Sequence, residues 1–234
     1  MPSLARRLVA EALGTFAFVF IGAAVVVVNG GFPNSGIGLL GIALAHAVAL
    51  SVMISATMAI SGGHLNPAVT VGLLVARRIG PVEAAAYIVT QLASACVAAL
   101  LVQWLLPAGA VRSALLGVPV IASSITLGQA MGIEIVLTFF LMSAVFGTAV
   151  SPDAPRVAGF GIGLVLLFDI LVGGPLTGAA MNPARAFGPA LVSGQWLGHV
   201  VYWIGPMVGA ILAALLWQYV LLPKAPVARR RRTD

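Results

Sequence analysis

Two identical tripeptides, about half the chain apart, carry the residues in this sequence that are best placed to do chemistry. Each reads asparagine, proline, alanine; asparagine is a strong helix N-cap, and proline is favoured at the first helical position. Each tripeptide therefore predicts the start of a helix, and its asparagine amide can donate hydrogen bonds to a passing molecule. The residues concerned are Asn66, Pro67, Ala68, Asn182, Pro183 and Ala184.

Each tripeptide opens a short apolar piece, at 67–75 and at 183–192. Half the thickness of a membrane is about 15 Å, or roughly ten helical residues, so each piece matches a half-length helix. Small, flexible residues precede both asparagines. Because non-helical backbone at membrane depth is tolerated only where protein or a water-filled cavity satisfies it, these residues suit a confined path. The carbonyl groups of these residues can accept hydrogen bonds, and the asparagine amides can donate them. Such a path would fit a neutral molecule that both donates and accepts hydrogen bonds.

The elements that must position these two pieces are membrane spans. Of the 234 residues, 61% are hydrophobic and only 8% are charged, whereas about a quarter are charged in soluble domains. The mean hydropathy of +1.11 leaves no room for a sizeable soluble domain, so residues 1–234 are expected to form one membrane domain. A transmembrane helix needs roughly 20 apolar residues. Six runs qualify: 8–29, 37–58, 82–106, 126–150, 157–173 and 197–222.

The basic residues predict the orientation of these spans. Six spans place both termini on one side, and of the 12 Lys and Arg residues only Arg112 and Arg185 would then lie on the other side. The positive-inside rule therefore predicts cytoplasmic termini, and the compact chain suggests a bacterial-type plasma membrane. Because the basic residues flank apolar runs, the net charge of +6 indicates contact with the lipid bilayer and not with nucleic acid.

The chain also repeats itself. Glu11 in the first span returns as Glu134, and the segment that begins at Tyr87 returns at Tyr202 with a shared Ala-x-x-Ala-Ala-Leu-Leu pattern. Each copy, 1–110 and 120–223, holds three spans and one half-length piece. Three is odd, so the second copy must enter from the opposite face, which is an inverted repeat typical of channels and transporters.

The inverted repeat has an electrostatic consequence for the two half-length pieces. They should enter from opposite faces and meet near the midplane with their N-termini back to back. Each helix N-terminus carries about +0.5 charge. Two of them facing one point would repel cations, including protons.

Several other classes of segment and site are disfavoured by the sequence. The first apolar run, from Leu8 to Val28, is longer than the core of a signal peptide, and no cleavage site follows it. The single cysteine, Cys96, cannot form an intrachain disulfide, and the three histidines lack the spacing of metal ligands. We expect no cofactor, no metal and no enzyme activity.

Together these motifs resemble those of the aquaporin family, also called the major intrinsic proteins. The resemblance covers essentially the whole chain and is carried by residues 11–15, 61–70, 178–190 and 202–206. It implies an all-α membrane protein with six transmembrane helices and two re-entrant half-helices, one pore per subunit, and a homotetramer. It also implies a passive channel that conducts water down osmotic gradients and excludes protons and ions.

The resemblance places a four-residue selectivity filter outward of the asparagines, which in this chain is His46, Ile170, Ala179 and Arg185. Orthodox water-selective members carry Phe and His at the first two positions. The set found here looks more like the vacuolar plant branch, the tonoplast intrinsic proteins. The glycerol-conducting branch matches less well, since it carries aspartate where Ala186 stands. The altered filter leaves open a channel for ammonia, glycerol, urea or hydrogen peroxide.

The resemblance assigns supporting roles to three further polar residues. Glu11 and Glu134 are expected to accept hydrogen bonds from the re-entrant loop of their own repeat, with a proton relay as the alternative. His64 matches a histidine that lines the cytoplasmic half of the pore, with local packing as the alternative. A secondary transporter would need an ion-coupling site, and a membrane-embedded enzyme would need a nucleophile with its base; neither pattern is found in the sequence.

Two glycine pairs with small-x-x-x-small spacing are predicted to let helices cross closely. One pair is Gly205 and Gly209, and the other is Gly128 and Gly132.

Overall fold

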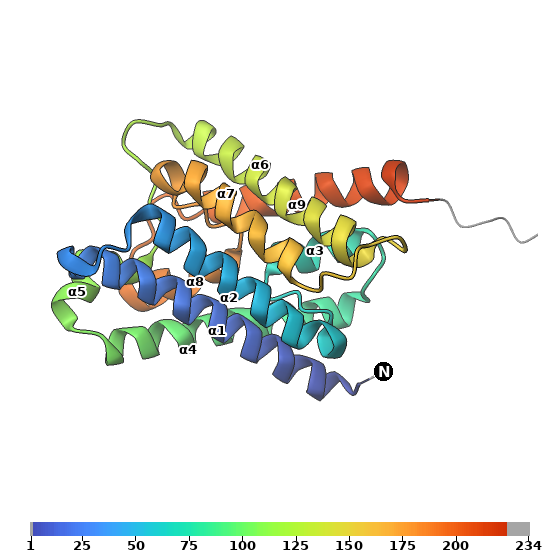
Figure 1. Ribbon diagram of the computed structural model, residues 1–234, viewed down its shortest axis with the longest axis horizontal. Coiled ribbons are helices and arrows are strands. Elements are labelled where there is room, and N and C mark those ends of the chain that lie inside the picture. The colour runs from blue at the N-terminus through green and yellow to red at the C-terminus, as the bar shows by residue number, and fades with distance from the viewer. Residues whose placement is uncertain (1, 224–234) are drawn as a thin grey trace, which may run out of the picture.

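The computed structural model describes residues 2–223, and within them the chain folds into a bundle of helices without strands (Figure 1). Six helices are long and apolar enough to cross a membrane, which confirms the predicted all-α fold with six spans. They are α1 (Leu4–Gly31), α2 (Gly38–Ser61), α4 (Pro81–Leu105), α6 (Leu127–Val145), α7 (Phe160–Thr177) and α9 (Val201–Leu216). Single π-helical turns extend α6 by η3 (Phe146–Val150) and α9 by η4 (Trp217–Leu221). The last span begins at Val201, four residues later than the sequence indicated, because turns occupy 197–200.

Two shorter helices lie within the bundle, as the half-length pieces predicted. Helix α3 (Pro67–Val75) begins at the first tripeptide and α8 (Pro183–Ser193) at the second. Helix α3 lies toward the end of the bundle that holds the N-terminus, and α8 lies toward the opposite end (Figure 1). Short elements complete the connections: η1 (Pro33–Ser35), α5 (Ala108–Ser113) and η2 (Leu115–Gly117).

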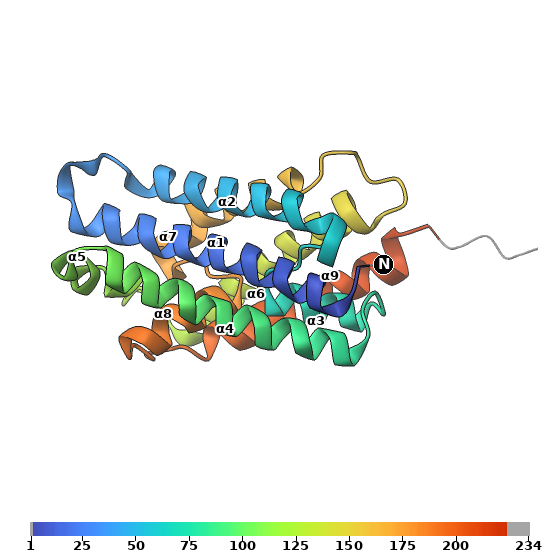
Figure 2. The ribbon, with the colours of Figure 1, turned by 90° about the horizontal axis from the view of Figure 1, so that it is seen from below.

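The long helices pack as neighbours in two matching sets. Helix α1 packs against α2 and α4, α6 packs against α9 and α7, and α2 packs against α7 across the middle (Figure 2). The α6–α9 crossing is close because a Cβ atom at Gly209 would lie 2.3 Å from the carbonyl oxygen of Ile135. Gly205 is similarly close to Glu134, which confirms the prediction for this pair.

The prediction for the second glycine pair was wrong. A Cβ atom at Gly132 would meet no atom within 4 Å, and one at Gly128 would meet only the Thr126 hydroxyl, at 3.9 Å. Both residues therefore lie on a face of α6 that crosses no other helix among the described residues. Spacing alone does not say which face of a helix a glycine pair occupies.

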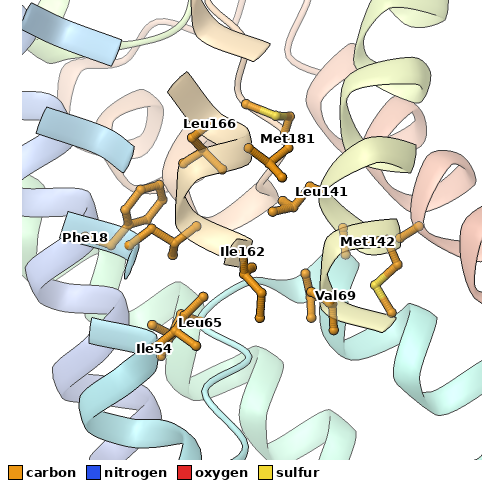
Figure 3. Close-up of a cluster of buried hydrophobic side chains, with 14 of the residues drawn as sticks. Phe18, Ile54, Leu65, Val69, Leu141, Met142, Ile162, Leu166 and Met181 are labelled. Atoms are coloured by element: carbon orange, nitrogen blue, oxygen red, sulfur yellow. The ribbon is translucent and has the colours of Figure 1, made fainter. Parts of the chain in front are cut away.

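Apolar side chains from several elements converge on the centre of the bundle (Figure 3). Phe18 comes from α1, Ile54 from α2, Leu141 from α6, and Ile162 and Leu166 from α7. The outer surface is also rich in large apolar side chains; Val82 is 80% exposed and Trp104 78%. A surface of this kind suits contact with lipid acyl chains.

Candidate functional site

The two asparagines begin their helices through the same local contacts. The Asn66 side-chain oxygen accepts a hydrogen bond from the Ala68 amide at 2.8 Å, and the Asn182 oxygen accepts one from the Ala184 amide at 2.9 Å. Proline at the first helical position needs no such partner, because it has no N–H. The contacts that start both helices are therefore local in sequence.

The asparagines are also joined crosswise through their amide nitrogens. Asn66 Nδ2 donates to the carbonyl oxygen of Met181, and Asn182 Nδ2 donates to that of Leu65, both at 2.9 Å. Each bond therefore joins one asparagine to the residue that precedes the other. An amide nitrogen has two hydrogens, so each asparagine keeps one donor for another partner.

The backbone before each asparagine takes left-handed conformations in matching places. Leu65 and Met181 have φ values of 50° and 48°, which side-chain-bearing residues rarely adopt. Strain of this kind persists only where the surroundings impose it, and it clusters at functional sites. Here the two strained residues are the ones whose carbonyl oxygens accept the hydrogen bonds of the opposite asparagines.

Glu11 on α1 holds the loop before α3. Its carboxylate accepts hydrogen bonds from the amides of His64 and Leu65, at 2.9 and 2.8 Å, and from the Ser61 hydroxyl at 2.7 Å. A fourth donor, Gln91 Nε2 on α4, lies at 2.8 Å. Four fixed donors thus satisfy the oxygens of this buried carboxyl group, as burial of a polar group requires.

Glu134 on α6 holds the loop before α8 in the same way. It accepts hydrogen bonds from the amides of Ala180 and Met181, at 2.9 and 2.8 Å, and from the Thr177 hydroxyl at 2.7 Å. Tyrosine hydroxyls complete the parallel, since Tyr202 donates to the Thr177 carbonyl just as Tyr87 donates to that of Ser61. No further donor among the described residues bonds Glu134.

Both asparagines lie in the wall of one internal cavity of about 250 Å³. Most of its wall is apolar, including the labelled Phe18, Ile54, Leu141 and Leu166 (Figure 3). The polar side chains in the wall are few: His64, Asn66 and Asn182 beside the re-entrant loops, and Arg78 in the turn after α3. A small polar molecule in this cavity would therefore find few hydrogen-bond partners apart from these groups and the loop backbone.

A second cavity of about 310 Å³ lies toward the far end of the bundle and brings together three of the four predicted filter residues. His46, Ile170 and Arg185 all line it. Ala179 is buried at 4% exposure, and the wall at this level is formed by its neighbour Gly178. Ala179, the predicted fourth position, thus adjoins this cavity through Gly178 and does not itself line it.

Arg185 is held in place by a backbone carbonyl. The side chain is 3% exposed, and its Nη1 donates to the carbonyl oxygen of Gly117 at 2.8 Å. Gly117 ends a run of three residues with positive φ, and a Cβ atom there would lie 2.8 Å from the backbone of Ala23 on α1. Only glycine fits this approach. Nothing in the sequence pattern pointed to Gly117 or to Gln91, because each acts across more than sixty residues.

His46 has a defined tautomer in this arrangement. Its Nδ1 lies 2.9 Å from the carbonyl oxygen of Ile42, and a carbonyl can only accept, so Nδ1 carries hydrogen. In the neutral ring Nε2 is then an acceptor. A Cβ atom at Gly22 on α1 would lie only 2.6 Å from Nε2, so the ring is packed against a glycine.

Two other buried polar residues, His64 and Asp169, lie outside this set. His64 lines the cavity that contains the asparagines, and its Nδ1 lies 3.1 Å from the Thr70 hydroxyl. Asp169, next to Ile170, is buried, and its carboxyl oxygens meet no hydrogen-bond partner among the described residues. Asp169 therefore forms no hydrogen bond with His46 or Arg185.

Comparison with known proteins gives consistent matches over most of the chain. The family described as "Major intrinsic protein" matches residues 1–217. Aquaporin TIP4-4 of Zea mays is 43% identical over 221 residues, covering 91% of this chain and 85% of its own length. Aquaporin TIP4-1 of Arabidopsis thaliana is 42% identical over 235 residues, covering 97% and 91%. In fold, the chain is similar to the X-ray structure of the aquaglyceroporin from Plasmodium falciparum, with a TM-score of 0.84, 24% identity and coverage of 93% and 97%.

Proposed function

This chain belongs to the major intrinsic protein family and is a passive membrane channel for water, and we propose that its pore passes between Asn66 and Asn182 and then past Arg185. On this proposal each asparagine donates its remaining amide hydrogen to a passing water oxygen. His46, Ile170, Ala179 and Arg185 form the narrowest passage.

The observation that carries the proposal is the crosswise pairing of the asparagines. One hydrogen of each amide is used by the opposite loop, so the side chain cannot rotate away and the second hydrogen keeps a fixed direction. Preorganised donors need no rearrangement when a water arrives. Two helix N-termini beside them, each with about +0.5 charge, would raise the energy of a cation at the same point.

The direct test is stopped-flow light scattering on proteoliposomes that contain the wild type or Asn182→Ala. We expect fast osmotic shrinkage with the wild type and a loss of most of the protein-dependent flux with the variant, because Asn182 also caps α8. Asn34→Ala, in the exposed turn η1, is the matched control and should behave like the wild type. Equal water flux in Asn182→Ala and the wild type would refute the proposed path.

A second candidate is a broader channel that also passes ammonia or another small neutral solute. The observation that favours it is the chemistry of the second cavity, where Arg185 supplies donors and His46 Nε2 is an acceptor. Ile170 supplies only apolar surface, so the passage lacks the histidine ring that orthodox water-selective members carry at this position.

His46→Phe separates the two candidates. If the filter is broad, ammonia or glycerol flux through the wild type is large and falls in His46→Phe, while water flux changes less. If only water passes the wild type, the histidine serves as well as phenylalanine, and the broader candidate is rejected. Measurement of all three permeabilities on the same vesicles gives the ranking directly.

The subunit assembly and the internal repeat belong to the same proposal. The subunits form a homotetramer, each with its own pore, and the exposed apolar helix faces supply the surface for both lipid and subunit contacts. Residues 1–110 and 120–223 are the two halves of an inverted repeat, which the matching contacts of Glu11 and Glu134 support. Mass measurement in detergent, by light scattering, tests the tetramer.

The host membrane is the last part of the proposal. The chain is a multi-pass membrane protein. We propose the plasma membrane with cytoplasmic termini, against the internal, tonoplast-like membrane that the TIP-type relatives suggest. Membrane fractionation of the source cells decides between them.

A further inference from the structure

Three arginines line one cavity at the end of the bundle that holds the N-terminus. Arg7 lies near the start of α1, and Arg77 and Arg78 lie in the turn that joins α3 to α4. The starts of α1 and α4 lie at the same end of the bundle (Figure 2). The cavity has a volume of about 630 Å³ and is more open than the two within the bundle.

The charges in this cavity are only partly compensated. Arg7 forms an ion pair with Glu83 near the start of α4, and its Nε atom is buried without a hydrogen-bond partner among the described residues. Arg78 donates to the side-chain oxygen of Gln218 at 2.8 Å, which is a neutral partner. The Arg77 side chain has no ion pair or hydrogen bond within residues 2–223. Three arginines against one glutamate leave two positive charges in excess.

The positive-inside rule explains why arginines gather at this end, but not why these three share a cavity. The predicted topology places Arg6 and Arg156 on the same side of the membrane, and neither lines this cavity. Arg6 lies instead in an apolar groove between α1 and α2. The arrangement of Arg7, Arg77 and Arg78 is therefore a property of the fold and needs its own explanation.

We propose that this cavity binds a terminal phosphate group with close to two negative charges, either the phosphomonoester headgroup of an anionic lipid or free inorganic phosphate, and that the bound group slows water entry into the pore. A phosphate monoester carries close to two negative charges and three acceptor oxygens, which match the excess charge of the walls. Guanidinium groups pair with phosphate through two parallel hydrogen bonds. The regulatory half of this inference depends on the proposed water pore.

The link to the pore is a shared wall. Gly62, His64 and Arg78 line both the arginine cavity and the cavity that contains Asn66 and Asn182. A phosphate held by Arg78 would therefore lie beside the entrance through which water reaches the asparagines. It would also draw the Arg78 side chain toward itself and alter that entrance.

The test compares the wild type with the double variant Arg77→Gln/Arg78→Gln in phosphatidylcholine vesicles. One arm adds phosphatidic acid, a monoester, and is compared with an equal amount of phosphatidylglycerol, a diester. The other arm adds inorganic phosphate, compared with chloride at the same ionic strength. The readout is the ratio of water permeability with and without the anion in the same variant, so that a change in basal flux cancels. Binding of radiolabelled inorganic phosphate to the purified protein is measured in parallel.

We expect the wild-type permeability to fall in at least one arm, and the arm that responds identifies the source of the phosphate. The double variant should lose the response, and each arginine removed should weaken phosphate binding by roughly tenfold. Arg156→Gln, an exposed arginine outside the cavity, is the matched control and should respond like the wild type.

Three results would overturn the inference: no response in either arm, an equal response to phosphatidylglycerol, or an unchanged response in the double variant. Phosphate binding that leaves water permeability unchanged would overturn the proposal that the bound group slows water entry. Water permeability in neutral vesicles without phosphate tests the pore separately, so a failure of one proposal is distinguishable from a failure of the other.

Discussion

The position of His46 depends on a residue that has no side chain. The ring is fixed on one side by the Ile42 carbonyl and rests on the other side against Gly22. A polar ring in a buried wall is useful only if its orientation is fixed, and here packing and one hydrogen bond share that task. Gly22 is therefore a positioning residue for His46 in the proposed filter.

Gly22→Ala should disturb the filter without removing any of its side chains. The added methyl group would lie 2.6 Å from His46 Nε2, so the ring must move and weaken its bond to Ile42. We expect water permeability to fall several-fold in stopped-flow assays while the protein remains folded by circular dichroism. Gly132→Ala, which meets no atom, is the control. Unchanged permeability in Gly22→Ala would show that the ring is not fixed by this contact.

His199 is a buried histidine outside the spans. Its ring lies 4.8 Å from that of Trp196 and 6.1 Å from that of Tyr202, and neither ring nitrogen has a hydrogen-bond partner among the described residues. Burial lowers the pKa of His199, because the charged ring would lose its hydration there. The folded protein thus prefers the neutral ring.

This preference makes a prediction about acid stability. Because the folded-state pKa of His199 is lower than the unfolded value of about 6.5, the unfolded state binds more protons between the two values. The contribution of the neutral His199 ring to the free energy of unfolding is complete above about pH 6.5. It is lost as the pH falls through the folded-state pKa. We expect thermal stability in detergent to drop on acidification, and less steeply in His199→Gln. Identical pH profiles for the two proteins would contradict this account.

The half-helices were predicted from sequence almost to the residue. Helix α3 matches the predicted 67–75, and α8 ends one residue beyond the predicted 183–192. The reason is that their starts are local, since the Asn cap and the following proline determine each start without help from the rest of the fold. The six spans could be predicted for a similar reason, because the hydropathy of a stretch of about twenty residues depends on that segment alone.

The parts that escaped prediction all depend on contacts between distant segments. Gln91 bonds Glu11, and the Gly117 carbonyl bonds Arg185, only because the fold brings α4 and η2 to these places. The proposed fourth filter residue, Ala179, comes from family spacing, and its neighbour Gly178 lines the second cavity. Spacing identifies a loop but not which of its atoms face the cavity.

The crossing of α6 and α9 offers a test of helix packing. Gly209→Ala would place a methyl group 2.3 Å from the Ile135 carbonyl, which is backbone and cannot turn aside. We expect a loss of stability of about 1–3 kcal/mol, the usual cost of overpacking a tight core. Unfolding in detergent, followed by circular dichroism, measures it. Gly132→Ala on the same α6 helix should show no loss, and equal stabilities would refute the close crossing.

The orientation of the whole molecule can be checked by chemical labelling. In a Cys96→Ala background, Ser35→Cys marks the turn after α1, and Asp153→Cys marks the loop between α6 and α7, both exposed positions. The proposed cytoplasmic termini place Ser35 outside and Asp153 inside. A membrane-impermeant maleimide added to intact cells should therefore label only the first variant. The reverse pattern would invert the proposed topology.

The crosswise bonds between the re-entrant loops also bear on how the protein is made. Residue 66 is synthesised before residue 182. Until the second loop is inserted, the Asn66 amide lacks its hydrogen-bond partner, the carbonyl oxygen of Met181. An unpaired amide in lipid costs several kcal/mol, so the first loop gains this stabilisation only when the second loop is in place. On the proposed path, both halves of the chain must therefore be inserted before the wall around the asparagines is complete.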